Sequence, residues 1–162
     1  MNNREYFIKR WEGEQRAFSA VLRAVPNDQL SYTPHEKSTK AGDLAWQLAE
    51  EQRLLIDLLD KQKMVWDSRP RPQSIDEINA AYDQWTNTLR EKLQGFDDAK
   101  WELPAQFLFG EHVVGESTVQ DFAWGFLFDL VHHRGQLAAY LRPMGAKVPS
   151  IYGPSADTGA GG

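Results

Sequence analysis

Four long segments carry apolar residues at intervals of three and four, and this spacing constrains the fold more than any other feature of the sequence. It places the apolar residues on one face of an α-helix. The predicted helices cover about 3–25, 41–64, 75–94 and 118–142. Together they predict an all-α fold in which the apolar faces meet inside a four-helix bundle.

Two capping boxes and several prolines set the limits of these helices. Ser74 with Glu77, and Ser117 with Gln120, have the spacing in which a hydroxyl caps the helix and the later side chain returns to the cap. Pro143 disfavours helical geometry in the residue before it, which predicts that the last helix ends near Arg142. The segment 96–116 favours β-structure around its glycines, and either a small hairpin or a loop fits it.

Composition limits the classes of function. With 162 residues and 41% hydrophobic content, the chain is long enough for one domain with a substantial core. We expect that domain to span 1–154, followed by a mobile tail at 155–162. The net charge of −5 and pI near 5.4 argue against a nucleic-acid partner.

The cellular setting is predicted from what the sequence lacks. There is no Cys, which excludes disulfides and thiolate catalysis and agrees with a reducing cytoplasm. No apolar run is long enough to cross a membrane, and the charged amino terminus does not resemble a signal peptide. We therefore predict a cytoplasmic protein with no membrane partner.

Polar residues on two apolar helix faces are the most informative feature for function. Gln47 and Glu51 lie one turn apart near the inner stripe of the second helix. Asp129 and His133 have the same spacing on the last helix. If these two helices are neighbours, the four side chains converge on one polar pocket.

Such a cluster supports two interpretations. Two carboxylates, an imidazole and an amide can ligate a divalent metal, and a set rich in oxygen favours Mn or Fe over Zn or Ni. The same groups can also satisfy one another as a structural hydrogen-bond network. The sequence leaves both interpretations open.

Other ionisable residues have simpler readings. Glu14 projects from the apolar face of the first helix, which places it either at an open end of the bundle or at the same interior site. His35 lies in a segment expected to be a loop. His112 lies at the polar tip of the segment that fits either a hairpin or a loop, and we expect it to be exposed to solvent. His132 is about 100° from His133 around the helix, so it should point away from the interior. Arg134 is expected to pair in solvent or at an interface.

Several motifs resemble those of one family. HHRGQL at 132–137, YLRPMG at 140–145 and IYGPSAD at 151–157 are similar to the signature of the DinB/YfiT-like proteins. These are bacterial four-helix-bundle proteins, many of them expected to be metalloenzymes. The stretch YTPHEKSTKAGDLAWQLAEE at 32–51 also resembles the second-helix region of that family, so the resemblance covers most of the chain.

The resemblance implies a metal site of three histidines, one from the second helix and two from the last. Carried over residue by residue, one of them matches His133. The other two positions hold Asp129 and Gln47. Glu51 is then the residue that compensates for the missing histidines, in a site for Zn, Ni, Mn or Fe. The resemblance also implies a homodimer.

Two functions follow as expectations, and the sequence does not decide whether the chain is an enzyme. In the first, the protein is a metal-dependent enzyme acting on a small molecule, as a thiol S-transferase or a hydrolase-like protein. In the second, it is a non-catalytic, stress-associated bundle that has lost its metal and serves as a small-ligand binder or structural protein. No catalytic nucleophile is identified, because no Cys or paired Ser–His arrangement is present.

Overall fold

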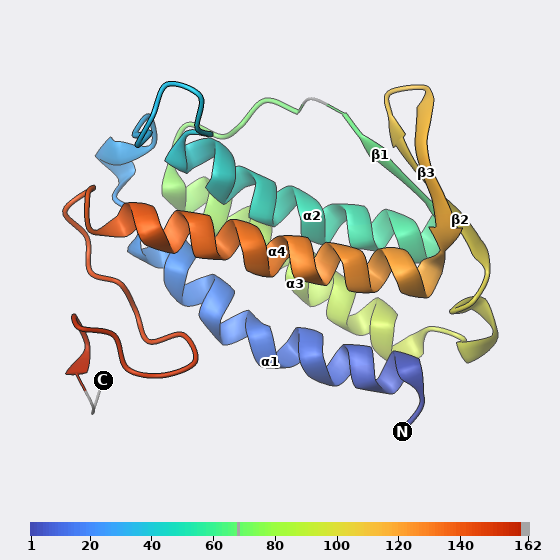
Figure 1. Cartoon of the computed structure of the whole chain (residues 1–162). Coiled ribbons are helices and arrows are strands. Elements are labelled where there is room, and N and C mark those ends of the chain that lie inside the picture. The colour runs from blue at the N-terminus through green and yellow to red at the C-terminus, as the bar shows by residue number, and fades with distance from the viewer. Residues whose placement is uncertain (68, 160–162) are drawn as a thin grey trace.

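The computed structural model describes residues 1–67 and 69–159. Within them the fold is mostly helical, with four α-helices and a small three-stranded sheet (Figure 1). In chain order the elements are α1 (Asn3–Ala24), α2 (Ala41–Lys61), β1 (Lys63–Trp66), α3 (Ile75–Gly95), β2 (Pro104–Phe109), β3 (His112–Thr118) and α4 (Val119–Leu141). Short 3-10 turns lie at Asn27–Gln29 and Asp98–Lys100.

The helices pack lengthwise around one apolar core. α2 contacts α3 and α4, and α1 contacts the same two helices, so that α4 lies between α1 and α2 in Figure 1. Most of the largest fully buried side chains come from the apolar faces of α1, α2 and α3, and Met64 of β1 joins them. They include Trp11, Phe18, Leu22, Leu48, Leu55, Leu58, Ile78 and Tyr82.

The helix starts agree closely with the capping signals. Ser74 accepts a hydrogen bond from the backbone N–H of Glu77, whose side chain returns to the cap, so this capping box is confirmed. The prediction for the last helix is wrong by one residue: Thr118, not Ser117, is the N-cap and accepts from Asp121. Ser117 belongs to β3, whose backbone pairing sets the start of the helix.

The prediction that the second helix continues to 64 is wrong. α2 ends at Lys61, and Gln62 follows in the left-handed conformation with φ of 50° while its N–H bonds Leu58. Lys63–Trp66 then pairs in parallel with residues 106–109 of β2. The β-favouring run Met64-Val65-Trp66 is therefore used in a sheet, a long-range pairing that helical periodicity could not reveal.

Of the two readings left open for residues 96–116, the hairpin is the one observed. β2 and β3 pair antiparallel, with a shift of register between Phe107 and Leu108. The turn between the strands contains Gly110 at a φ of 56°, which favours glycine. β3 leads directly into α4, so the sheet packs beside the first half of that helix (Figure 1).

A buried ion pair joins α1 to α4. Glu14 and Arg134 have side chains only 7% and 3% exposed, and one guanidinium nitrogen donates to the Glu14 carboxylate. Tyr152, from the segment after α4, places its hydroxyl within 2.9 Å of the same carboxylate. Both earlier expectations for Glu14 are therefore wrong, as is the expectation that Arg134 pairs in solvent or at an interface. Each residue satisfies the charge of the other inside the fold.

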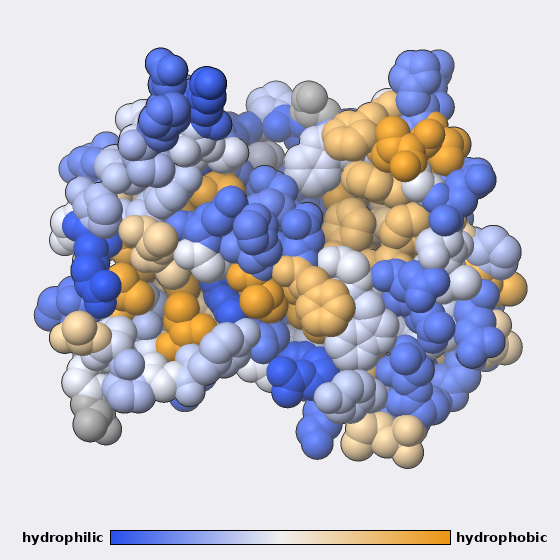
Figure 2. Space-filling model, in the orientation of Figure 1, coloured by the Kyte–Doolittle hydropathy of each residue, from blue (hydrophilic) through white to orange (hydrophobic). Residues whose placement is uncertain are grey.

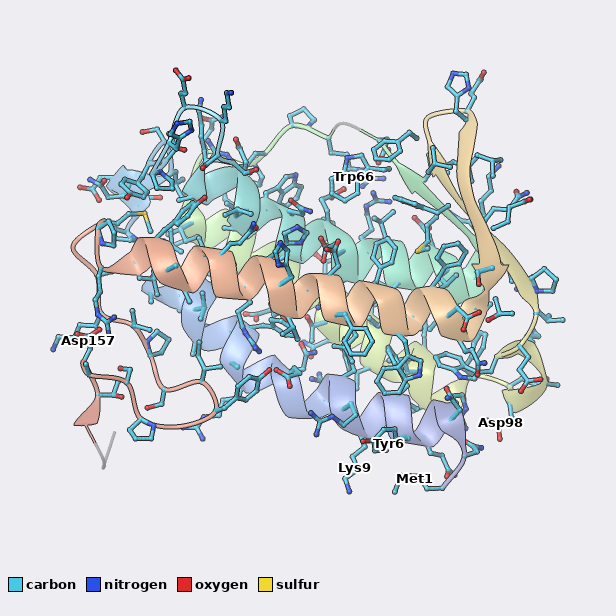
Figure 3. All side chains as sticks on the ribbon, viewed as in Figure 1. Met1, Tyr6, Lys9, Trp66, Asp98 and Asp157 are labelled. Carbon is cyan, nitrogen blue, oxygen red and sulfur yellow. The ribbon has the colours of Figure 1, made fainter. Side chains whose placement is uncertain are left out.

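The segment after α4 runs back toward α1 (Figure 1). Asp157, labelled in Figure 3, accepts from the Arg142 side chain and the Val148 backbone, each at 2.9 Å. Ser155 and Thr158 also bond one another within the part of the predicted tail that the structure describes. Residues 160–162 of that predicted tail lie outside the described residues. Among the described helices, none is long and apolar enough to cross a membrane.

We predict that Glu14→Ala destabilises the protein by about 3–5 kcal/mol, because it leaves the Arg134 guanidinium buried without its carboxylate. The double variant Glu14→Leu/Arg134→Leu removes both charges and should be the more stable of the two. Urea unfolding followed by circular dichroism measures both free energies. A double variant less stable than Glu14→Ala would contradict this account.

Candidate metal site between α2 and α4

Gln47, Glu51, Asp129 and His133 meet where α2 packs on α4. Each helix contributes a pair of side chains one turn apart, so the helical spacing stacks each pair on one face. Direct packing of the two helices then brings the pairs together. The convergence expected from the sequence is the arrangement observed.

The contacts within the cluster are short. His133 Nδ1 lies 2.9 Å from Glu51 Oε1, and His133 Nε2 lies 3.8 Å from Asp129 Oδ1. The Gln47 amide nitrogen is 3.1 Å from Glu51 Oε1 and 3.1 Å from His133 Nε2. All four side chains are therefore within reach of one small ion or one shared proton network.

Glu51 occupies the innermost position. Its side chain is fully buried, and burial raises the pKa of its carboxyl group even though His133 and Gln47 both contact it. Its second oxygen, Oε2, has no hydrogen-bond partner among the described residues. A buried carboxylate oxygen without a partner costs free energy, so this atom is the one in the cluster most in need of a ligand.

His133 lies between the buried and the exposed carboxylate. Burial alone would lower the pKa of its imidazole, but the hydrogen bond to Glu51 and the charges of Glu51 and Asp129 outweigh burial, and the pKa is raised. The Asp129 side chain is half exposed and stands at the rim of the cluster. A ligand or proton therefore reaches His133 from the side of Asp129.

The donor atoms fit a divalent metal ion. One ligand atom from each of Glu51, Asp129 and His133 can be chosen so that all three lie within 4.8 Å of one another. Carboxylate oxygens with one imidazole suit Mn or Fe and also Zn. A 180° rotation of the Gln47 amide group turns its oxygen toward the same centre.

An aromatic cavity of about 720 Å³ adjoins the cluster. Gln47 and Asp129 belong to its wall, together with His132 and Gly125. The other lining residues are aromatic and come from β1, β2 and α4: Trp66, Phe107, Phe109, Phe122, Phe126 and Phe128. Figure 2 shows apolar side chains gathered over the sheet and the first half of α4, and Trp66 is labelled in Figure 3.

Sequence reasoning missed part of this cavity. Trp66 lies just beyond the predicted second helix, where no strand was expected, and Phe107 and Phe109 lie in the segment left open between hairpin and loop. Their alternation in QFLF, residues 106–109, was the available signal, because residues two apart share one face of a strand. The parallel pairing with β1 that brings Trp66 to the same place had no signal in the local sequence.

The remaining histidines lie outside the cluster. His35 is exposed in a loop, where its Nδ1 accepts from the Lys37 backbone. His112 is exposed at the start of β3. His132 is exposed, as predicted, but it lines the aromatic cavity and its ring lies 5.3 Å from that of His133.

Fold and site together define a helical protein with an internal carboxylate–imidazole cluster that opens onto an aromatic cavity. The chain matches the DinB family over residues 1–160 and belongs to that family.

Relatives and solved structures agree with this assignment. The chain is 25% identical to the uncharacterized protein YrdA of Bacillus subtilis, over 94% of this chain and 90% of that protein. A DinB-like protein from Bacillus cereus has a similar fold, with a TM-score of 0.75, 23% identity, and coverage of 91% of this chain and 97% of that one. YjoA, a DinB-like protein of Bacillus subtilis, has a similar fold with a TM-score of 0.70 at 14% identity, and the match covers 90% of this chain and 96% of that one. These likenesses show the fold.

We predict that the metal-free protein loses stability as pH rises above about 6.5. The pKa of His133 is raised on folding, so its contribution is fully present below the unfolded pKa and is lost as pH rises through the folded one. The raised pKa of Glu51 acts in the same direction at lower pH. Urea unfolding at a series of pH values measures how steeply the free energy of unfolding falls with pH. His133→Gln should flatten this dependence above about pH 6.5, and His132→Gln should not. Equal slopes in the two variants would show that His133 is not the group responsible.

Proposed function

We propose that this protein is a metal-dependent enzyme that acts on a small molecule, with its ion held by Glu51, Asp129 and His133 and with Gln47 completing the set. The observation that carries the proposal is the unpartnered oxygen of the fully buried Glu51, which lies in a group of three donors close enough to share one ion. Membership of the DinB family supports it. We interpret the four helices as a bundle of the DinB/YfiT-like type, which places the site inside it.

The donor set indicates which ion fits. Two carboxylates and an amide oxygen outnumber the single imidazole, and oxygen donors suit harder ions. We therefore expect Mn or Fe to be preferred over Zn and Ni. Gln47 and Asp129 stand where the resemblance implies histidines, and Glu51 compensates for them, so the site differs from a three-histidine site in charge as well as in ligand type.

A bound divalent ion would lower the pKa of a coordinated water or thiol and so supply a nucleophile at neutral pH. The chain's own groups would then hold and move protons. His133 can keep a proton on the nitrogen that faces Glu51, since that carboxylate accepts from it at 2.9 Å. Asp129, half exposed at the rim, is placed to orient a polar group that enters from the cavity. These roles fit a thiol S-transferase or a hydrolase-like reaction.

One observation favours the non-catalytic alternative. The Glu51, Gln47 and His133 side chains already bond one another at 2.9–3.1 Å, which is sufficient for a structural network. In that case the protein is a stress-associated small-ligand binder or structural protein without a metal. The homodimer implied by the family resemblance stays a prediction, as does the cytoplasmic location.

Metal binding separates the two functions. We predict that purified protein incubated with Mn, Fe, Ni and Zn and then desalted retains about one ion per chain. His133→Ala and Glu51→Gln should weaken binding by more than the roughly 10–100-fold that loss of an outer-shell partner costs. His132→Ala is the matched control and should bind as the wild type does. Elemental analysis and titration calorimetry measure both quantities, and a protein that retains none of the four metals would contradict the proposal.

We also predict that metal affinity rises with pH. The raised pKa values of His133 and Glu51 mean that protons compete with the ion for the same atoms. Below the raised pKa of His133, affinity should increase about tenfold per pH unit for each proton released. Calorimetric titrations at pH 6 and pH 8 test this, and an affinity independent of pH would place the ion elsewhere.

A further inference from the structure

The aromatic cavity beside the metal-site residues has the size and lining of a small-molecule site. Its volume of about 720 Å³ lies within the range of ligand pockets, which are mostly apolar with a few placed polar groups. Six of its ten lining residues are Phe or Trp. Its polar groups include Gln47 and Asp129, which also belong to the metal-site cluster.

The aromatic walls are suited to a flat guest. The Phe107 ring, on β2, lies 5.5 Å from that of Phe126, on α4, in an edge-to-face arrangement. The Phe109 ring is tilted and 5.5 Å from Phe107. Because these rings contact one another in different orientations, they offer both faces and edges to a ring placed against them.

The charge of the lining residues determines which flat molecules can bind in the cavity. Neither Lys nor Arg is among the lining residues, and Asp129 supplies a carboxylate. Aromatic faces also attract cations. An aromatic carboxylate would therefore be repelled in the metal-free protein, whereas a neutral or amino-bearing aromatic molecule would be accepted.

The position of Asp129 argues against a second copy of the chain as the occupant. The ionic contact of Asp129 in the described structure is with His133 at 3.8 Å, and its side chain is half exposed. A protein surface packed over the cavity would have to supply a Lys or Arg to this carboxylate, because burying it unpaired is costly. A small molecule with an amino or hydroxyl group can instead donate to it.

We propose that the cavity is a binding site for small aromatic molecules whose neutral or cationic polar group faces Asp129 and Gln47. Its role as the substrate pocket rests on the proposed metal-dependent function, whereas binding itself does not. The class of substrate is then an aromatic amine or a neutral aromatic compound that presents its polar group at the metal site.

Calorimetry on the metal-free protein with two probes of similar size tests the charge preference. 2-Phenylethylamine should bind at least tenfold more tightly than 3-phenylpropionate, and Asp129→Asn should reduce that ratio. An equal affinity for the two probes, or binding of neither, would overturn the proposal.

Two glycines of α4 provide a matched pair of variants. Gly125 lines the cavity, and a Cβ added there meets no atom within 4 Å. A side chain added at Gly125 therefore starts in open space, and Gly125→Leu should occupy part of the cavity and weaken 2-phenylethylamine binding at least tenfold. Gly135, on the same helix, has equally open space but does not line the cavity, so Gly135→Leu should bind the probe as the wild type does. Unchanged binding by Gly125→Leu would contradict the location.

Because Gly125 lies one turn from the candidate ligand Asp129, a change at Gly125 is close to the metal site. Phe109→Ala serves as a second variant for this reason. Phe109 lies on β2, which carries none of the four candidate ligands, and its loss should weaken probe binding with metal affinity unchanged. Light scattering with the same variants tests whether a second copy of the chain covers the cavity. A wild-type dimer that Gly125→Leu converts to a monomer would assign this face to a subunit contact and overturn the proposal.

The two proposals fail separately. Probe binding without any metal binding would contradict the proposed function but support this site, and metal binding without probe binding would contradict this site but support the proposed function.

Discussion

The contact between Glu51 and His133 is the interaction on which the candidate site depends. A fully buried carboxyl group is tolerated in the α2–α4 seam because the imidazole lies 2.9 Å away. That contact fixes which face of each helix turns inward. It thereby also fixes where Gln47 and Asp129 stand, because each lies one turn along the same helix face.

The next residue along α4 makes a second buried polar contact on the other side of that helix. Successive helical residues differ in direction by about 100°, so while His133 faces Glu51 on α2, Arg134 faces Glu14 on α1. Tyr152 adds its hydroxyl to the second contact. Polar contacts with both neighbours therefore fix the orientation of α4 about its own axis. Apolar packing alone would specify this orientation less strictly.

Helical periodicity was sufficient to predict the four helices and the stacking of Gln47 on Glu51 and of Asp129 on His133, because both follow from local spacing. The convergence of the two pairs was expected only if the two helices are neighbours, and the packing of α2 against α4 meets that condition. It was insufficient where the structure depends on long-range pairing. The β1 strand was read as the end of a helix, and Glu14 and Arg134 were not recognised as partners 120 residues apart. The aromatic cavity was missed for the same reason, since its lining residues come from four elements, α2, β1, β2 and α4, that only the fold brings together.

Crystals soaked in Mn and measured by anomalous diffraction test the central claim most directly, because the signal locates the ion without reference to activity. The account predicts one strong peak at bonding distance from Glu51, Asp129 and His133. Density with no peak beside these three residues, at a concentration of Mn that saturates known sites, would contradict it.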